Sequence, residues 1–374
     1  RAIGAVTAEN IVACEDIPPF DRAAVDGFAV RASDTFRASF AHPVKLRVVR
    51  GALHKGNRKF SLKRKEAVRV ATGAPLPNGA DAVVMVEYTK SSRDSVAVFQ
   101  PVSPGKNVSA KGEDVKNGET IIRAGTLLRP QEIGMLAALR RLRVRVIPKP
   151  KVAVITTGAE LASPWKDRKK SEIVDVNTYS LSAAVIESGG AVGILRRIPD
   201  DYELLKKEIS KALKHDIVLI SGGSSVGEFD FAPDVLRRLG KIVFHGVATR
   251  PASPTAFGLV KNKPVFCLPG FPAASIISFR LFVRPALMKL QGLPPTHGRR
   301  VLKAKLARNV GSTLGRADIL RVKLRTSKGE TIADPIRITG SGILSSLTRA
   351  DGFVLIPENV EGLAKDEEVE VELF

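Results

Sequence analysis

The sequence predicts an α/β multidomain protein organised around a doubly wound, mostly parallel sheet. Three observations predict it. From residue 151 onward, short apolar runs typical of buried strands alternate with segments that are apolar at helical spacing. The 374 residues exceed the size of one ordinary core, so several domains are expected. The flanking regions carry short alternating apolar patches broken by glycine, proline and asparagine, which is typical of smaller β domains.

The central domain is expected to span residues 151–292. Its predicted strands are residues 151–158, 191–198, 216–223, 241–248 and 264–270, and its predicted helices are residues 177–190, 200–215, 232–240 and 273–290. Pro285 is expected to kink or break the last helix, because proline lacks the N–H that an interior turn needs. Parallel strands place their carboxyl ends along one sheet edge, where we expect ligands.

The flanking segments predict further domains. Residues 31–119 are expected to form a small, mainly β domain. Residues 129–140 predict a helix with Pro130 in its first turn and Glu132 beside it. The stretch at 292–298 is a natural linker to a C-terminal β domain at 293–374.

The composition excludes several classes of protein. Lys plus Arg total 59 against 38 Asp plus Glu, a net charge of +21 that attracts polyanions. The basic residues are scattered, with no zinc-finger spacing and little aromatic interleaving, so nucleic-acid binding is not expected and a smaller anionic substrate is. No apolar run is long enough to span a membrane. Cys14 and Cys267 are too isolated for a disulfide framework or a metal cluster, so a reducing, cytoplasmic location is expected.

A glycine-rich loop follows the predicted strand at 216–220. It reads "SGGSSVG" and comprises Ser221, Gly222, Gly223, Ser224, Ser225 and Gly227. Glycines permit positive φ and close approach of a ligand, and N–H and hydroxyl groups are donors to an anion. A plain strand-to-helix turn is the alternative, and the loop matches neither the Walker nor the dinucleotide-binding motif.

Carboxylates follow several of these strands. Glu228 and Asp230 directly follow the loop, where they would repel a phosphate unless a cation such as Mg²⁺ lay between; either could instead be an ordinary helix N-terminal residue. Glu160 and Asp200 follow two other strands, so these loops are expected to converge on one cleft. Asp175 to Asn177 is another contributor to this cleft, or a helix cap.

Further candidates are basic or lie in rigid turns. Arg250 is a better anion ligand than His245, and Ser253 lies in the same stretch. Pro269 and Pro272 frame a turn, "CLPGFP", that suits a pocket wall or a plain chain reversal. Asp26 and Thr72 lie in turns framed by proline and glycine, and turn chemistry alone explains much of both.

The chain resembles the molybdopterin molybdenumtransferase family, called MoeA in prokaryotes and represented in animals by the E domain of gephyrin. The matching stretches occur in family order from about residue 10 to 290: "PPFDRAAVDGFAV", "ATGAPLPNGADAVVMVE", "GEDVKNGETIIRAGTLLRPQEIGMLAALR", "VAVITTGAEL", "SGGSSVGEFDF", "HGVATRPASPTAFG" and "LPGFPAASIISFRLFVRPAL". The C-terminal part resembles the family's last β domain only in position and pattern.

The resemblance implies a homodimer with four domains per subunit. Residues 1–30 and 120–150 would form an elongated, discontinuous first domain, interrupted by the small β domain at 31–119. Residues 151–292 would form a molybdopterin-binding domain similar to molybdopterin adenylyltransferase, followed by the C-terminal β domain at 293–374. Other molybdenum cofactor synthesis enzymes are further partners that the resemblance implies, in a cytoplasmic protein with no membrane association.

The resemblance also implies an activity. Members bind adenylylated molybdopterin, join molybdate or tungstate to its dithiolene sulfurs, and hydrolyse the phosphoanhydride with Mg²⁺ to release AMP. The family's catalytic positions match Asp26, Thr72, Glu160, Asp200 and Asp230, of which Glu160, Asp200 and Asp230 would hold Mg²⁺. Asp114 is a further acidic match, and Asp26 and Thr72 are expected to act across the dimer interface. The pterin and oxyanion would be bound by the loop residues Ser221, Gly222, Gly223, Ser224, Ser225 and Gly227, with Arg250, Ser253, Pro269 and Pro272.

Several residues depart from the family pattern. Where the family commonly reads Lys-Pro-Gly-Lys-Pro, this chain has residues 250–254, "RPASP", so Arg250 and Ser253 replace two lysines. Phe271 replaces a usual asparagine, Ala159 a common aspartate and Ser224 a common valine. Two interpretations follow: an active enzyme, or a divergent paralogue that binds a pterin or acts as a scaffold with little catalysis.

Overall fold

The computed structural model describes residues 2–49, 60–165, 167, 169–222, 231–337 and 339–374. The chain divides into two compact units: residues 1–3 with 7–146, and residues 4–6 with 147–374. Two short strands, β1 (Val6–Thr7) and β12 (Val146–Ile147), lie at the chain positions where one unit passes into the other. None of the described helices is long and apolar enough to cross a bilayer.

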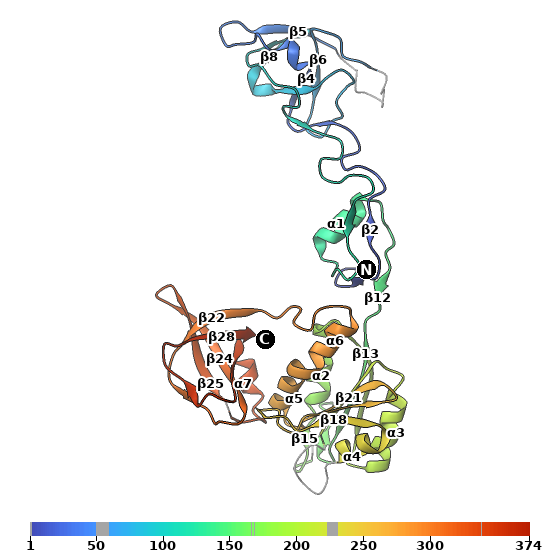
Figure 1. Cartoon of the computed structure of the whole chain (residues 1–374), viewed down its shortest axis with the longest axis vertical. Coiled ribbons are helices and arrows are strands. Elements are labelled where there is room, and N and C mark those ends of the chain that lie inside the picture. The colour runs from blue at the N-terminus through green and yellow to red at the C-terminus, as the bar shows by residue number, and fades with distance from the viewer. Residues whose placement is uncertain (1, 50–59, 166, 168, 223–230, 338) are drawn as a thin grey trace. The chain divides into compact units, whose positions relative to one another are not determined.

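The small β domain of the first unit is a six-stranded sheet in the order β7-β4-β6-β5-β9-β8 (Figure 1). The strands are β4 (Gly27–Val30), β5 (Val44–Val48), β6 (Glu66–Val70), β7 (Ala82–Met85), β8 (Thr89–Ser91) and β9 (Ser95–Val98). Two 3₁₀ turns, η1 (Ala32–Asp34) and η2 (Val86–Tyr88), connect them. Phe28, Leu46, Val84 and Val96 pack in its core. The sheet thus begins before residue 31, because β4 pairs with both β6 and β7.

The rest of the first unit joins segments from both sides of the small β domain. β2 (Ile11–Val12) pairs with β11 (Thr120–Ile122), and β3 (Arg22–Ala23) pairs with β10 (Val108–Ser109). Helix α1 (Pro130–Ala138) confirms the helix predicted there, and Glu132 accepts a hydrogen bond of 2.9 Å from the backbone N–H of Arg129 as its cap. Ile11, Ile122 and Leu136 share one core.

The doubly wound domain has a six-stranded sheet in the order β16-β13-β17-β21-β20-β18. Its strands are β13 (Lys151–Thr157), β16 (Ala191–Ile198), β17 (Ile217–Ser221), β18 (Lys241–His245), β20 (Ala256–Val260) and β21 (Lys263–Leu268). The pairs β13–β16, β13–β17 and β17–β21 are parallel. The prediction of a mostly parallel sheet is confirmed for these four consecutive strands.

Helices cover both faces of this sheet. Helices α3 (Tyr202–Ala212) and α4 (Phe231–Leu239) pack with Ala153 and Ile155 of β13, whereas α2 (Asn177–Glu187) packs with Val152 and Val154. Successive strand residues point to opposite faces, so one apolar run supplies both cores. Figure 1 shows α2 on one side of the sheet and α3 and α4 together on the other.

One helical run, residues 272–290, also covers the α2 face, and where a kink or break was predicted at Pro285 the run is continuous and contains a π-helical segment just before the proline. Helix α5 (Pro272–Ser278) passes through a π-helical segment, η3 (Phe279–Val283), into α6 (Arg284–Leu290). Proline removes a backbone donor, and a wider turn accommodates the loss.

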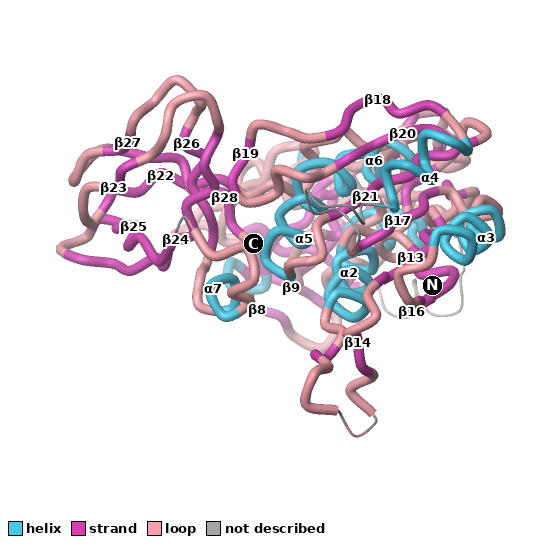
Figure 2. The backbone as a smooth tube through the Cα atoms, turned by 90° about the horizontal axis from the view of Figure 1, so that it is seen from below, coloured by secondary structure: helices cyan, strands magenta, loops and turns pink. Residues whose placement is uncertain are grey.

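One strand of this sheet differs from the prediction. Strand β20 was not predicted, and β20 is antiparallel to both β21 and β18. Lys261 and Asn262 link β20 to β21 with φ of 49° and 62°, the left-handed conformation of a tight hairpin turn (Figure 2). The hairpin reverses the chain direction at β20, whereas β18, being antiparallel to β20, runs in the direction of the four parallel strands.

The C-terminal domain is a small closed barrel. Its sheet runs β19-β24-β25-β22-β28-β26, and a further pairing of β24 with β26 closes it. The strands are β19 (Thr249–Arg250), β22 (Val301–Leu306), β24 (Ala317–Ser327), β25 (Glu330–Arg337), β26 (Gly352–Ile356) and β28 (Glu368–Leu373). Shorter elements complete it: β23 (Val310–Gly311), β27 (Gly362–Leu363) and α7 (Ser345–Thr348).

The doubly wound domain has two further short strands, which follow β13 in the chain. They are β14 (Leu161–Ala162) and β15 (Ile173–Val174), and they pair with each other in parallel.

Candidate active site

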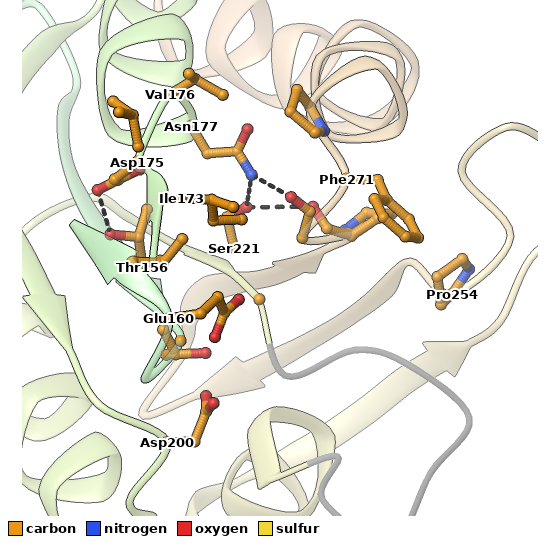
Figure 3. A pocket seen from close by; sticks show the side chains of 18 residues that line it. Thr156, Glu160, Ile173, Asp175, Val176, Asn177, Asp200, Ser221, Pro254 and Phe271 are labelled. Atoms are coloured by element: carbon orange, nitrogen blue, oxygen red, sulfur yellow. Dashed lines mark hydrogen bonds between the residues drawn. The ribbon is translucent and has the colours of Figure 1, made fainter. Parts of the chain in front are cut away.

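A pocket of about 410 Å³ lies at the carboxyl ends of β13, β17 and β21, the sheet edge that the sequence predicted for ligands. Its lining combines polar strand ends with an apolar wall (Figure 3). The lining residues are Thr156, Thr157, Gly158, Glu160, Leu161, Ile173, Val174, Asp175, Val176, Asn177, Asp200, Ser221, Gly222, Pro254, Pro269, Gly270, Phe271 and Pro272.

Two of the predicted carboxylates, Glu160 and Asp200, line this pocket together. Glu160 follows β13 and Asp200 follows β16, the neighbouring parallel strand, so the pairing of these strands places both loops at one edge. The backbone N–H of Ala159 donates to Asp200 Oδ2 at 3.3 Å, which ties the two loops. The adjacent Asp201 has another role, because its side chain caps α3 by accepting from the N–H of Leu204 at 2.7 Å.

The pocket floor contains a buried polar network that involves Asp175. Its Oδ2 accepts from the hydroxyls of Thr156 at 3.0 Å and Thr178 at 2.6 Å, and its Oδ1 accepts from the backbone N–H of Thr178 at 3.0 Å. Asp175 therefore both caps the start of α2 and fixes the end of β13. It lines the cleft and caps a helix, the two roles that the sequence suggested as alternatives.

Asn177 joins three strand-end segments. Its amide Nδ2 donates to Ser221 Oγ at 2.9 Å and to the carbonyl of Gly270 at 2.7 Å (Figure 3). Asn177 is 7% exposed, and its Oδ1 has no hydrogen-bond partner among the described residues. Sequence reasoning treated this residue as a contributor or cap; its function of connecting β17 to the proline turn follows only from the tertiary structure.

The glycine-rich loop is described only at its start. Ser221 is buried, and its hydroxyl donates to the carbonyl of Pro269 at 3.2 Å while accepting from Asn177. Gly222 has φ of 109°, and a Cβ there would lie 2.2 Å from the carbonyl oxygen of Thr157. This position therefore requires glycine. The predicted residues Gly223, Ser224, Ser225, Gly227, Glu228 and Asp230 lie outside the described residues.

A second pocket, of about 350 Å³, contains the predicted Arg250 and Ser253. Strand β19 of the doubly wound domain pairs with β24 of the barrel, and this places Arg250 against Asp318. Asp318 is fully buried, forms an ion pair with Arg250 and accepts from Ser312 Oγ at 2.8 Å.

The barrel also contributes residues that sequence reasoning missed. Arg316 and Ser341 line the second pocket, and Arg316 Nε lies 3.7 Å from the Asp318 carboxylate. Two donors at this pocket, Thr249 Oγ1 and Arg250 Nε, are buried without a hydrogen bond to any described residue. No local sequence pattern indicates that Arg316 or Ser341 lines this pocket, because only the pairing of β19 with β24 brings the barrel next to Arg250.

The proline turn separates the two pockets. Pro269 and Phe271 line both of them, and so does Pro254 from the opposite loop. Pro272 is the first residue of α5, a position that tolerates proline because its N–H would be unsatisfied there in any case. The turn is thus both a pocket wall and a helix start.

Asp26 and Thr72 meet in the first unit. The backbone N–H and the hydroxyl of Thr72 donate to Asp26 Oδ1 at 2.7 and 2.8 Å. These hydrogen bonds hold the pKa of Asp26 below its ordinary value, since they stabilise the carboxylate form. The pair was predicted from separate motifs, and the structure brings the two side chains together.

The described residues contain no group of three or more His, Cys, Asp or Glu side chains placed to hold a metal ion. Glu160 and Asp200 supply two carboxylates, and Asp230 lies outside the described part of the chain. Mg²⁺ is commonly held by one or two carboxylates together with substrate phosphates, so this donor set fits it.

Comparisons with known proteins agree over the whole chain. The MoeA N-terminal region (domain I and II) matches residues 1–139, a probable molybdopterin binding domain matches 153–289, and the MoeA C-terminal region (domain IV) matches 303–374. A molybdopterin molybdenumtransferase of Staphylococcus aureus is 34% identical over 99% of this chain and 89% of its own length. A putative molybdopterin biosynthesis protein of Methanocaldococcus jannaschii is 39% identical over 100% of this chain and 90% of its own length.

Solved structures give the same result. A molybdopterin biosynthesis MoeA protein of Pyrococcus horikoshii has a TM-score of 0.85 and 38% identity, and the match covers 100% of this chain and 93% of that one. The family models, the curated relatives and the solved structure all span both units, including the barrel of the second unit. The chain belongs to the molybdopterin molybdenumtransferase, or MoeA, family of molybdenum cofactor biosynthesis.

Proposed function

We propose that this protein inserts molybdate or tungstate into adenylylated molybdopterin, with Mg²⁺-assisted hydrolysis of the phosphoanhydride and release of AMP. One observation carries the proposal: a pocket edged by two carboxylates adjoins a pocket lined by two arginines, and both share the wall formed by Pro254, Pro269 and Phe271. The substrate has the matching chemistry, a phosphoanhydride beside sulfurs that receive a metal oxyanion.

The carboxylate pocket suits the anhydride. Glu160 and Asp200 would hold Mg²⁺ together with the substrate oxygens, and the ion when bound supplies charge neutralisation at the bridging phosphates. The N–H of Ala159 orients Asp200, and Gly222 lets the backbone approach a phosphate closely. A water that gives a proton to a carboxylate of the pocket attacks one phosphorus, the bridging P–O bond breaks, and AMP and the pterin monophosphate separate as anions.

The second pocket suits a tetrahedral dianion. Arg250 and Arg316 supply guanidinium groups, and Thr249 and Ser341 supply hydroxyls. Asp318 neutralises part of this charge, so the pocket has a small net positive charge. Arg316 offsets the loss of the family lysine at Ser253, which favours the active enzyme over a catalytically weak pterin-binding paralogue.

One assay tests the proposal. The protein is incubated with adenylylated molybdopterin, Mg²⁺ and molybdate or tungstate, while AMP release and metal retention are followed by chromatography. Glu160→Gln or Asp200→Asn is expected to slow AMP release about a hundredfold or more with the fold intact, because each removes a charged ligand from the phosphate site. Glu187→Gln, at an exposed helix end, is the matched control.

Two results would contradict it. Tight pterin binding without metal-dependent AMP release would favour a binding or scaffold function. Unchanged turnover in both variants would remove these carboxylates from the site. Asp26, Thr72 and Asp230 as catalytic residues, the homodimer with shared active sites, further synthesis enzymes as partners, and the cytoplasmic location stay predictions from the resemblance.

A further inference from the structure

Phe271 is an exposed aromatic side chain at the boundary of the two pockets. It lines both of them, and its side chain is 62% exposed. An apolar ring in this place is stabilised if a ligand covers it. The next question is which part of the substrate lies against the Phe271 ring.

The backbone at Phe271 is held in place on both sides. Pro272 follows Phe271 and restricts it to extended φ and ψ, observed at −71° and 127°. The Phe271 carbonyl accepts from the N–H of Ser275 at 2.9 Å in the first turn of α5. A ring on such a rigid turn loses little conformational entropy when a ligand stacks on it.

The barrel supports the ring from behind. A Cβ built on Gly342 would lie 3.2 Å from Cδ1 of Phe271, so the loop backbone of the barrel passes directly beside the ring. The barrel is fixed there because the carbonyl of Ser341 accepts from the N–H groups of Ala273 and Ala274 at 3.0 and 3.2 Å. Gly342 leaves the space that the ring occupies.

The order of groups along the wall identifies the ring that Phe271 meets. Figure 3 shows Glu160 and Asp200 on one side of the pocket and Phe271 and Pro254 on the other. In adenylylated molybdopterin the phosphoanhydride separates adenosine from the dithiolene, and the pterin lies beyond the dithiolene. With the anhydride at the carboxylates and the oxyanion beside Arg250, the dithiolene and the pterin lie on the Phe271 side.

We propose that Phe271 stacks on the pterin ring of the substrate and so selects for a pterin beside the oxyanion pocket. This inference rests on the proposed function, because it takes the anhydride to lie at Glu160 and Asp200. The negative face of one π system against the positive edge or offset face of another makes such contacts favourable beyond their buried area. Phe271 is a specificity residue here, and it takes no part in bond breaking.

Equilibrium dialysis of the full chain with three probes tests this contact: adenylylated molybdopterin, AMP, and ring-free pyrophosphate with Mg²⁺. Phe271→Leu keeps an apolar side chain but removes the ring, and it is expected to weaken binding of adenylylated molybdopterin by about two- to tenfold. Binding of AMP and pyrophosphate should stay unchanged. Phe271→Tyr should restore wild-type affinity, and Phe36→Leu, which changes another exposed phenylalanine, should have no effect.

A second variant approaches the same contact without changing Phe271. Gly342→Val fills the space behind the ring and should also weaken binding of the pterin nucleotide. Gly311→Val is the matched control in the same barrel, because a Cβ there meets nothing within 4 Å. Circular dichroism of each variant shows whether the barrel remains folded.

The outcomes separate this inference from the proposed function. Equal or tighter binding of the pterin nucleotide by Phe271→Leu would overturn the stacking and leave the function intact. An equal loss for AMP would mean that Phe271 meets adenine, which also overturns it. No binding of the pterin nucleotide by the wild-type protein would overturn both.

Discussion

Asp318→Asn is expected to destabilise the second unit by about 2 kcal/mol. Asp318 is fully buried and is paired with Arg250, whose side chain is 27% exposed, and with Arg316, which is 38% exposed. Removing one partner of a buried ion pair typically costs about 3–5 kcal/mol because the other charge is left uncompensated. Both arginines retain access to water, so we expect roughly half of that penalty.

This free energy corresponds to a lower unfolding temperature. For a unit of this size, about 1 kcal/mol shifts Tm by roughly 2–4 °C, so the expected decrease is about 4–8 °C. Differential scanning calorimetry measures it. Asp366→Asn is the matched control, because Asp366 is exposed in the same barrel.

The double variant Arg250→Met/Asp318→Asn isolates the interaction. Because it removes both charges, its loss should be smaller than the sum of the two single losses. A Tm for Asp318→Asn within about 1 °C of Asp366→Asn would refute the reasoning, since the ion pair would then contribute no measurable stability.

Two further changes test the strand-end geometry and the first unit. Gly222→Ala should destabilise the chain by about 1–3 kcal/mol, because of its φ of 109° and the close carbonyl of Thr157; calorimetry against Gly311→Ala measures it. Thr72→Val should raise the pKa of Asp26 towards its ordinary value of 3.8, seen by carbon NMR titration of the carboxyl group. Since the folded pKa is lowered, any stability from this pair is present above the unfolded pKa and is lost as pH falls through the folded one, so the two proteins should differ least in acid.

The predicted fold came from periodicity, and periodicity explains both its success and the omission of β20 from the six-stranded sheet. β13 is buried on both faces and is therefore a continuous apolar run that is easily recognised. β20, with the sequence "AFGLV", follows Pro254 closely and contains Gly258, so its short alternating pattern resembles a loop. Its turn residues Lys261 and Asn262 were a usable signal, because asparagine tolerates the left-handed conformation that such hairpins need.

The carboxylate pocket could be predicted and the arginine pocket only in part. Glu160 and Asp200 each follow a strand of one parallel sheet, and general rules bring such positions together. Arg316 approaches Arg250 only because β19 adds to the barrel through its pairing with β24, and no rule of local sequence gives that pairing. Asn177 is a similar case, since its partners Ser221 and Gly270 lie 44 and 93 residues away.

The charge of the arginine pocket, where we propose that the oxyanion binds, shows why a single motif is an incomplete test of function. Counted along the chain, the replacement of a family lysine by Ser253 removes one of two cations. Counted in the folded pocket, Arg250 and Arg316 supply two guanidinium groups against the single carboxylate of Asp318. In the proposed oxyanion site, Arg316 of the barrel thus supplies a second cation beside Arg250. Because a guanidinium donates through a fixed fork, such a pocket should select a tetrahedral oxyanion by geometry as well as by charge.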